Sequence, residues 1–339
     1  MKRSVRLPLF ASFLTAAACG GGGNSNSPTA AVPRHPVQLV LFYDENGNGT
    51  AEPTENAAVP DVDVEIAGQI GRSAKVTGLT TVPDVPDGPH TVALRTPSVP
   101  PYYRLSGAAP SVSVPQAATS PVALTLSIGS NRPNRYLTFG DSITDGLGST
   151  DIDGFRGPLE EALQRHFGRG TVEADGLGGT KSDDGSARIT SIINRVRPAY
   201  TLILYGTNDW KRCPGGEVPC ITVGSLQSMI GAVKSISSLP VLGTIPPVNP
   251  HDNPPERNEW VTRMNVAVRA MAAQEGVPVA DVHAAFVRDA NGHLEDLFVD
   301  LVHPNDRGYR VIANEFFKAI TSRSTGSSSS LLRSLFQRP

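Results

Sequence analysis

The sequence has almost no imbalance of charge, because 30 lysine and arginine residues face 32 aspartate and glutamate residues and leave a net charge of -2. The cations are scattered along the chain and form no block. Without a basic face, nothing draws a phosphate backbone or an anionic membrane surface to one side of the protein. We therefore expect no nucleic-acid partner.

Long hydrophobic runs are also missing, apart from one segment near the amino end. The apolar stretch Leu7 to Ala18 follows three early cations and is too short to span a bilayer, which is typical of a secretory signal. The segment Ala16-Ala17-Ala18-Cys19 resembles the lipobox of bacterial lipoproteins, although Ala16 stands where that motif prefers leucine. The resemblance implies that residues 1–19 are the signal and that Cys19 is lipidated, whereas an ordinary cleaved signal peptide is the alternative. Either way we expect an exported chain, held to a cell-envelope membrane only by a lipid anchor.

Cysteine is scarce, with three residues in 339. Besides Cys19 there are Cys213 and Cys220, which bound a short loop rich in glycine and proline. In an oxidising compartment such a pair predicts a disulfide bond. A zinc site is the weaker interpretation, because no histidine or further cysteine lies nearby to complete four ligands.

The chain is long enough for two domains, and its texture changes along its length. Residues 20–36 are mostly Gly, Asn, Ser, Pro and Ala, which predicts a flexible linker. Residues 37–129 contain short alternating runs separated by Asp-Gly, Pro-Asp and Pro-Pro, which predict a small all-β sandwich. The expected strands are Val37 to Tyr43, Val62 to Ile66, His90 to Leu94 and Val122 to Ile128.

Residues 134–321 alternate buried-type apolar runs with amphipathic segments, which predicts an α/β domain in three layers around a parallel sheet. The expected strands are Tyr136 to Phe139, Thr171 to Ala174, Thr201 to Tyr205, Val241 to Ile245 and Val277 to Val282. The expected helices are Pro158 to Phe167, Asp184 to Val196, Ser225 to Ile236, Pro255 to Gln274 and one capped by Asn305 that runs through Ala319. The serine-rich tail, residues 322–339, is predicted to be disordered.

Several familiar catalytic motifs are absent. The chain has no G-x-S-x-G, so it lacks the usual nucleophile elbow, and it has no H-E-x-x-H for a catalytic zinc. Thr180 replaces the glycine that a phosphate-binding loop needs before Lys181. Apart from His303, the histidines have no partner at ligand spacing and are interpreted as surface or packing residues: His35, His90, His166, His251, His283 and His293.

Polar residues follow the expected strands at positions that a parallel sheet brings to one edge. Ser142 comes directly after the first strand, and Asn208 follows the third, where its amide can donate two hydrogen bonds to an oxyanion. Near the end of the domain, Asp300 precedes His303 by three residues. This spacing lets Asp300 hold Nδ1 of the imidazole and leaves Nε2 to take a proton from Ser142.

In order and spacing, the segment from about Arg135 to Ile320 resembles the SGNH (GDSL-like) hydrolases, which implies a flavodoxin-like α/β fold and serine esterase chemistry. The resemblance assigns the nucleophile to Ser142, the relay to Asp300 and His303, and the oxyanion hole to Asn208 and Gly178. Gly176 and Gly179 compete for the last role, and Gly178 is preferred because it leads the following polar turn. No cofactor or metal is expected for catalysis.

A second motif lies in the predicted sandwich, in the segment from Asp44 to Glu55. Oxygen ligands at loop positions one, three and five, a glycine at six and a glutamate at twelve fit a calcium loop without flanking helices. The loop resembles those of B-type repeats in bacterial surface adhesins, which implies structural Ca²⁺. The alternative is a solvated hairpin turn. The expected ligands are Asp44, Asn46, Asn48, Thr50 through its carbonyl, and Glu55.

These patterns predict an exported, monomeric serine esterase that acts on a small-molecule or glycan ester. The segment Gly154-Phe155-Arg156 resembles the Gly-Tyr-Arg segment of carbohydrate acetylesterases, so a carbohydrate acetyl ester is the expected substrate. A lysophospholipase or thioesterase is the first alternative. An inactive surface-adhesion module is the alternative from another class.

Overall fold

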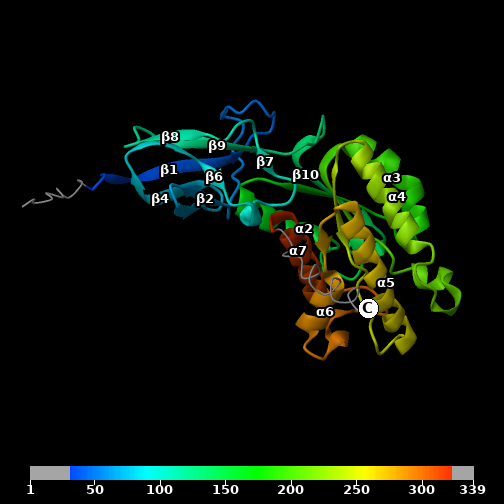
Figure 1. Ribbon diagram of the computed structural model, residues 1–339. Coiled ribbons are helices and arrows are strands. Elements are labelled where there is room, and N and C mark those ends of the chain that lie inside the picture. Colours follow the sequence, from blue (N-terminus) through cyan, green and yellow to red (C-terminus); the bar gives the residue numbers. More distant parts are fainter. Residues whose placement is uncertain (1–30, 323–339) are drawn as a thin grey trace, which may run out of the picture. The chain divides into compact units, whose positions relative to one another are not determined.

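Residues 31–322 are described by the structure, a computed structural model, and residues 34–322 belong to one compact unit (Figure 1). The predicted signal with Cys19, most of the predicted linker and nearly all of the predicted tail lie outside the described residues. Among residues 31–322, no helix combines the length and apolar character that crossing a membrane requires.

The amino-terminal part of this unit is built from three small sheets around β1 (Arg34–Tyr43). In the four-stranded sheet, with the order β4-β1-β9-β7, β1 runs antiparallel to β4 and parallel to β9. A three-stranded sheet has the order β3-β2-β6, and β5 pairs with β8. The bounds are β2 (Asp63–Ile66), β3 (Gln69–Arg72), β4 (Leu79–Pro86), β5 (Gly88–Thr91), β6 (Ala93–Leu94), β7 (Arg104–Leu105), β8 (Ser111–Val114) and β9 (Ser120–Thr125), with a short 3-10 helix η1 (Thr96–Ser98).

Side chains of β1 alternate as a half-buried strand requires. Val37, Leu39 and Leu41 are fully buried, whereas Gln38 between them is exposed. The strand begins at Arg34, so the predicted linker boundary at residue 36 is wrong by three residues. Arg34 pairs with Pro86 of β4, and this backbone pairing extends the strand beyond its apolar stretch.

The remainder of the unit is the predicted α/β domain, with a parallel sheet in the order β11-β10-β12-β13-β14. All five strands are found where they were predicted. Every residue of β12 is buried, because the strand has a neighbour on each side and helices over both faces. The bounds are β10 (Arg132–Gly140), β11 (Thr171–Gly176), β12 (Pro198–Leu204), β13 (Leu239–Gly243) and β14 (Val279–Ala280).

The two faces of this sheet belong to two hydrophobic clusters, because successive strand residues point to opposite sides. On one face, Phe139 and Ile203 pack with α3, α4 and α5; on the other, Leu202 and Leu204 pack with α2, α6 and α7. The helices that the sequence predicted are α2 (Arg156–Phe167), α3 (Ser182–Val196), α4 (Thr222–Ser235), α5 (Pro255–Glu275) and α7 (Asp306–Thr321). Asn305 caps α7 as predicted, since its side chain accepts hydrogen bonds from the N–H groups of Arg307 and Gly308.

Short helical elements were missed by the sequence analysis. These are α1 (Ser142–Asp145), α6 (Val282–Ala290) and the 3-10 helices η2 (Asp209–Arg212), η3 (Pro214–Gly216) and η4 (Leu294–Leu297). Each is too short to show several helical periods in the sequence. Helix α6 is instead held by its cap, because the Asp281 side chain accepts a hydrogen bond from the N–H of Ala284.

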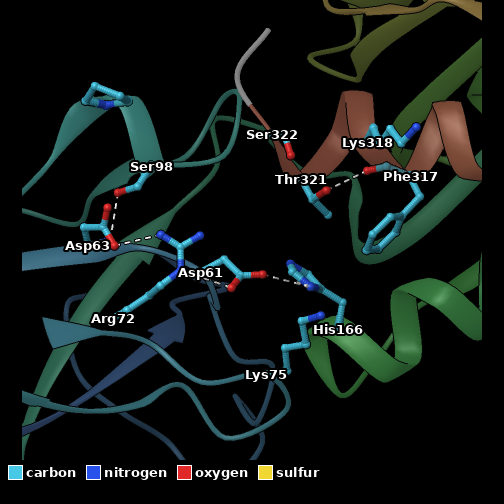
Figure 2. Close-up of a pocket in the computed structure, with 11 residues that line it drawn as sticks. Asp61, Asp63, Arg72, Lys75, Ser98, His166, Phe317, Lys318, Thr321 and Ser322 are labelled. Atoms are coloured by element: carbon cyan, nitrogen blue, oxygen red, sulfur yellow. Dashed lines mark hydrogen bonds and ion pairs between the residues drawn. The ribbon is translucent and has the colours of Figure 1, made fainter. Parts of the chain in front are cut away.

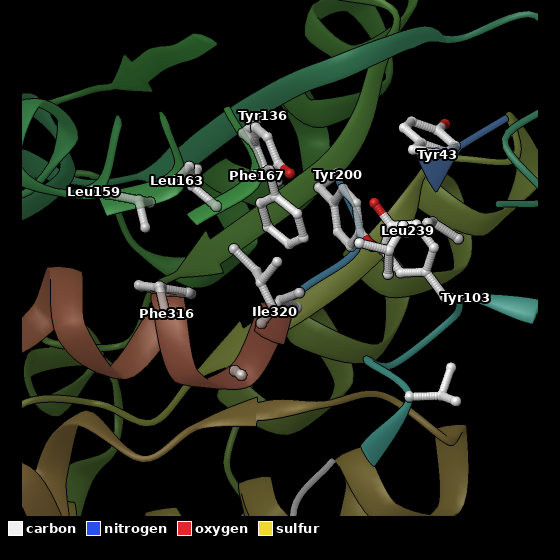
Figure 3. Close-up of a cluster of buried hydrophobic side chains, with 14 of the residues drawn as sticks. Tyr43, Tyr103, Tyr136, Leu159, Leu163, Phe167, Tyr200, Leu239, Phe316 and Ile320 are labelled. Atoms are coloured by element: carbon white, nitrogen blue, oxygen red, sulfur yellow. The ribbon is translucent and has the colours of Figure 1, made fainter. Parts of the chain in front are cut away.

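The β-rich region and the α/β domain share one hydrophobic cluster rather than meeting through a linker (Figure 3). Tyr103 packs edge-on to Tyr43 and stacks on Phe167 of α2, while Tyr136 stacks on Tyr200 within the sheet. The Ala58 N–H also donates to the Phe167 carbonyl at 2.9 Å. Because apolar burial and backbone hydrogen bonds cross this seam, the two parts stabilise one another.

Candidate active site

Ser142 is placed by the pairing of β10 with the strands on both sides. Gly140, the last residue of β10, lies opposite Gly176 of β11 and Leu204 of β12. Two residues later Ser142 starts α1, whose cap is Asp141: the Asp141 side chain accepts from the N–H of Ile143. The serine is 7% exposed, so its hydroxyl lies at the surface of the carboxyl edge of the sheet without protruding from it.

The relay geometry that the spacing predicts is present. His303 Nε2 lies 2.9 Å from Ser142 Oγ, and His303 Nδ1 lies 2.7 Å from Asp300 Oδ2. The second oxygen of Asp300 accepts from the N–H groups of Val302 and His303, which makes the segment a tight turn. Burial raises the pKa of Asp300, but the hydrogen bonds from His303 and from these N–H groups outweigh it and hold the pKa below its ordinary value. The Asp300 carboxylate is therefore ionised at neutral pH.

The turn that carries the relay is tied to the loop after β13. Asn249 Nδ2 donates to the Asp300 carbonyl, and Asn253 Nδ2 donates to the Leu301 carbonyl. On the other side, Gly148 in the loop after the nucleophile lies close to His303: a Cβ there would stand 3.0 Å from His303 Cβ and 2.7 Å from the Pro304 carbonyl oxygen. Only glycine fits at this left-handed position.

The structure separates the three glycines that competed for the oxyanion role. Gly176 is structural, because a Cβ there would stand 2.3 Å from the Asp145 nitrogen. Gly179 faces open space. A Cβ on Gly178 would instead lie 3.8 Å from Ser142 Cβ, so Gly178 is the glycine beside the nucleophile. Among the described residues, neither the Ser142 N–H nor the Gly178 N–H donates to another protein group.

Asn208 lies at the same edge, where two acceptors orient its amide. Its Nδ2 donates to the Thr180 carbonyl at 3.0 Å and stands 3.5 Å from Asp141 Oδ2. The second contact is long, so one amide proton remains available for a developing oxyanion. The five predicted catalytic residues are thus brought to one edge of the sheet.

The segment after Asn208 is held in place by the hydrogen bonds of Asp209 and by a disulfide bond. Asp209 is fully buried and accepts hydrogen bonds from both the N–H and the hydroxyl of Ser182 and from the hydroxyl of Thr222. Cys213 and Cys220 form the predicted disulfide. The oxyanion segment is therefore fixed to the amino ends of α3 and α4 before the chain enters its glycine-rich loop.

Arg257 links the two halves of the site and was not found by the sequence analysis. Its Nη2 donates to the Thr207 carbonyl, directly before Asn208, and its Nη1 donates to Asn253 Oδ1. Because Asn253 in turn holds the relay turn, one guanidinium positions both the oxyanion segment and the turn. The side chain is buried without a carboxylate partner among the described residues, and this burial lowers its pKa.

Arg188 is a second missed residue, and it binds the ends of three strands. Its guanidinium donates to the carbonyls of Gly140 and Asp175 and to the Tyr205 hydroxyl, and it lies 4.2 Å from the centre of the Phe139 ring. The sequence around Arg188 carries no local signal of this role, because the groups that it binds are distant in sequence.

Four exposed apolar side chains stand in the loops of the site. Leu147, Leu177, Val299 and Leu301 are each about half exposed, and they stand in the loops that carry Ser142, Gly178 and His303. Exposed apolar side chains in such loops are available to contact an apolar group of a ligand. We call these four residues the apolar rim.

The segment after the nucleophile supports the loop rather than lining the site. Phe155 is buried and stacks on Phe316 of α7 at 5.5 Å, and Arg156 pairs with Asp153. The resemblance of Gly154-Phe155-Arg156 to acetylesterases is therefore not matched by a side chain directed at Ser142.

The predicted calcium loop follows β1 and folds back on itself. The Asp44 carboxylate is buried and accepts from the N–H groups of Gly47, Asn48 and Gly49, while Glu55 Oε1 accepts from those of Glu45 and Asn46. Glu55 Oε2 is buried without a partner, which suits a cation. Among residues 31–322, no three His, Cys, Asp or Glu side chains gather as a metal site, so a cation in this loop would also need amide or backbone carbonyl oxygens.

One further carboxylate, Glu52, binds within this loop, and another, Glu45, connects the loop to its surroundings. Glu52, which the sequence analysis did not name, accepts from the amides of Asn46 and Asn48. Glu45 accepts from Asn134 and from Arg169, and Arg169 also donates to the Thr54 carbonyl. The loop is therefore attached to the α/β domain at both of its ends.

Comparison with known proteins identifies the family of the chain. A model of the GDSL-like lipase/acylhydrolase family matches residues 138–311, just over half of the chain. No curated protein matches the chain.

Solved structures similar to the chain include three hydrolases. The acetylxylan esterase Axe2 from Geobacillus stearothermophilus is 22% identical, with a TM-score of 0.48 over 58% of this chain and 98% of that one. A lipase/acylhydrolase from Enterococcus faecalis is 21% identical, with a TM-score of 0.46 over 56% and 95%. LAE5, an alpha/beta hydrolase from the metagenome of Lake Arreo, is 24% identical, with a TM-score of 0.46 over 56% and 96%.

Asp141 generates a prediction about pH. Burial raises the pKa of this carboxyl to about 7, and the Asp209 charge adds to the rise, while the Ile143 N–H and Arg188 oppose it. Between the unfolded pKa near 4 and the folded value near 7, the folded state holds a proton that the unfolded state has lost, so stability falls as pH rises. Asp141→Asn cannot ionise. Relative to wild type, it should gain free energy of unfolding from pH 4.5 to pH 8, measured by urea denaturation.

At each pH, the free energy of unfolding of wild type is subtracted from that of Asp141→Asn. This difference no longer contains the contribution of any group that titrates alike in both proteins. Two parallel profiles across this range would contradict the raised pKa.

Proposed function

Because the chain belongs to the GDSL-like lipase/acylhydrolase family and is a carboxylic ester hydrolase, we propose that Ser142, His303 and Asp300 are its catalytic residues. The observation that carries the proposal is the continuous hydrogen-bond line from Ser142 Oγ through His303 to Asp300, at 2.9 Å and 2.7 Å. A nucleophile, a base within reach of it and a group that orients the base are the parts that acyl transfer requires.

In the first step His303 Nε2 takes the hydroxyl proton as Ser142 Oγ attacks the ester carbonyl carbon. The carbonyl electron pair moves to oxygen, and the resulting oxyanion is held by the N–H groups of Ser142 and Gly178 and by the Asn208 amide. When the intermediate collapses, the bond to the alkoxy oxygen breaks and His303 returns the proton to the departing alcohol. The product of this step is an acyl ester of Ser142.

In the second step water replaces the alcohol. His303 takes a proton from the water, whose oxygen attacks the acyl carbon, and the same oxyanion contacts form again. Collapse returns the proton to Ser142 Oγ and releases the carboxylic acid. The ionised Asp300 stabilises the imidazolium in both steps and keeps the ring in one orientation.

For the substrate, we propose an acylated glycan, with acetyl as the acyl group. This proposal rests on the expected export of the chain and on the sequence resemblance of Gly154-Phe155-Arg156, although Phe155 itself is buried. A lipid ester, cleaved by lysophospholipase or thioesterase activity, is the second candidate, and the apolar rim is the observation that favours it.

We also propose the setting of the enzyme: an exported monomer, anchored through a lipid on Cys19 or released after cleavage of the signal. The catalytic proposal needs no cofactor. Export, the anchor and the monomeric state rest on the sequence alone.

In the β-rich region we propose structural Ca²⁺. The unpartnered, buried Glu55 Oε2 supports a cation, and so does the buried Asp44. The ligands would be Asp44, Asn46, Asn48, the Thr50 carbonyl and Glu55. The ion would stabilise the loop and, through Glu45 and Arg169, its attachment to the α/β domain.

Removal of the catalytic groups is the first test of this proposal. Ser142→Ala and His303→Ala should each lower kcat by at least about 1,000-fold, because the nucleophile and its base act as a unit. Asp300→Ala should be milder, since the carboxylate mainly orients and stabilises the imidazole. Steady-state hydrolysis of p-nitrophenyl acetate measures the losses, and melting temperatures verify that the variants are folded.

Matched controls exist for both substitutions. Ser228→Ala removes a hydroxyl from the exposed side of α4, and His293→Ala removes an exposed imidazole, so neither should change kcat. Covalent labelling of Ser142→Ala by a fluorophosphonate would show that another residue is the nucleophile.

The substrate proposal predicts a preference along a series of esters. The value of kcat/KM should be highest for acetyl and should fall as the acyl chain lengthens to palmitoyl, and acetylated xylan should be deacetylated. If long chains or lysophosphatidylcholine are preferred, and Leu177→Ser with Leu301→Ser removes only that preference, the lipid candidate is correct. If a folded protein with Ser142 intact hydrolyses no ester, the alternative that the chain is an inactive surface-adhesion module is favoured.

Calcium should raise the melting temperature of the full chain. With an affinity near 0.1 to 1 mM, roughly that of extracellular modules, calcium at ten to a hundred times Kd adds about 1.4 to 2.7 kcal/mol. Scanning calorimetry with and without chelator measures the effect. Glu55→Ala should abolish it, whereas Glu259→Ala, an exposed glutamate on α5, should not. An unchanged calcium response in Glu55→Ala would show that the ion binds elsewhere.

A further inference from the structure

A polar pocket of about 400 Å³ lies at the seam between the β-rich region and the α/β domain (Figure 2). One wall carries Asp61, Asp63 and Arg72 from the β-rich region, and the other carries His166 from α2 and Phe317 from α7. The volume is within the range of small-molecule sites. None of these residues takes part in the proposed catalysis.

His166 is the least satisfied group in this pocket. It is 4% exposed, and neither ring nitrogen has a hydrogen-bond partner among the described residues. The ring is held edge-on against Phe167 and Phe317, and the nearest charge is Asp61, at 3.8 Å from Nδ1. Burying a polar group without a partner is unfavourable, so water or a ligand that binds His166 in the pocket would stabilise it.

The protonation state of His166 defines what it can offer. Burial lowers its pKa to about 4, and Lys75 adds to the lowering while Asp61 opposes it. At neutral pH the ring is therefore neutral, with one nitrogen as donor and the other as acceptor. Such a pair suits a hydroxyl group, which can both donate and accept.

Charges of both signs line the pocket. Arg72 is shared between Asp63, at 2.7 Å, and Asp61, at 3.3 Å. The Lys75 carbonyl accepts from the Thr77 N–H, but its ammonium group has no hydrogen-bond or ion-pair partner within residues 31–322. The pocket thus presents carboxylate acceptors and cationic donors together, beside the aromatic ring of Phe317.

This mixture excludes several classes of ligand. Two carboxylates disfavour a phosphate or another multiply charged anion, and Arg72 with Lys75 disfavours a metal ion. A lipid chain would leave the two ring nitrogens of His166 and the Lys75 ammonium without hydrogen-bond partners. A polyhydroxylated molecule satisfies both kinds of group, and its C–H face can pack on an aromatic ring.

We propose that this seam pocket binds one sugar residue of a glycan, at a site separate from the catalytic one. His303 precedes the start of α7 and Thr321 ends it at the pocket. A helix of 16 residues spans about 24 Å, so a sugar held here cannot be the one attacked by Ser142. By binding a sugar residue, the pocket would keep the enzyme attached to a polymeric glycan. The affinity of the pocket for sugar does not depend on which ester the enzyme cleaves.

Histidine ring signals in the NMR spectrum of the full chain test the proposal, because His166 and His303 report on the two sites separately. His166→Gln assigns the first signal and His303→Gln the second. The probes are D-xylose, D-glucose, N-acetyl-D-glucosamine and D-glucuronate, titrated at millimolar concentration. At least one should shift the His166 signal saturably, and Ser142→Ala should bind it equally well.

Variants at two other pocket residues, the exposed Lys75 and the half-buried Phe317, make the test independent of a substitution at His166. Lys75→Ala, which removes an exposed side chain, and Phe317→Leu should each weaken binding about tenfold, or about 1.4 kcal/mol. Lys211→Ala, which removes an exposed lysine in η2, should not weaken binding. The proposal is overturned if no sugar shifts His166, if binding survives both pocket variants, or if sugars shift only His303. A loss of esterase activity alone would leave these readings unchanged, so the two proposals fail separately.

Discussion

The parallel register of β10 between β11 and β12 is the constraint on which the rest of the site depends. Gly140 lies opposite Gly176 on one side and Leu204 on the other, so the three chains leave the sheet at the same level. Ser142, Gly178 and Asn208 follow these residues within four positions. A slip of one residue in either pairing would turn every side chain of a strand to the other face and separate Ser142 from the proposed oxyanion donors Gly178 and Asn208.

Buried and half-buried polar groups next to this edge fix the positions of the chains that leave it. Arg188 joins the ends of three strands, Asp209 anchors the oxyanion segment, and Arg257 bridges that segment to the relay turn. Each is expensive to bury unless its partners are in place. Their cost is offset only when the whole edge is assembled, which makes the site a cooperative unit rather than a set of independent side chains.

The β-rich region is part of the same structure. Its tyrosines continue the core of the α/β domain, and its loop from Asp44 to Glu55 is attached through Glu45 to Asn134 and Arg169. A change in that loop therefore acts on the stability of both parts. The seam that results from this packing also creates a polar pocket, which neither part would form alone.

Much of this protein is determined by local sequence: the five parallel strands, the cap at Asn305, the disulfide and the three-residue spacing of Asp300 and His303 all follow from neighbours along the chain. Other features required the tertiary structure. The choice of Gly178 over Gly176 and Gly179 depends on which backbone faces Ser142, and the roles of Arg257 and His166 depend on partners 50 or more residues away. Periodicity and turn chemistry describe a segment, whereas these roles arise only when distant segments meet at a sheet edge or a seam.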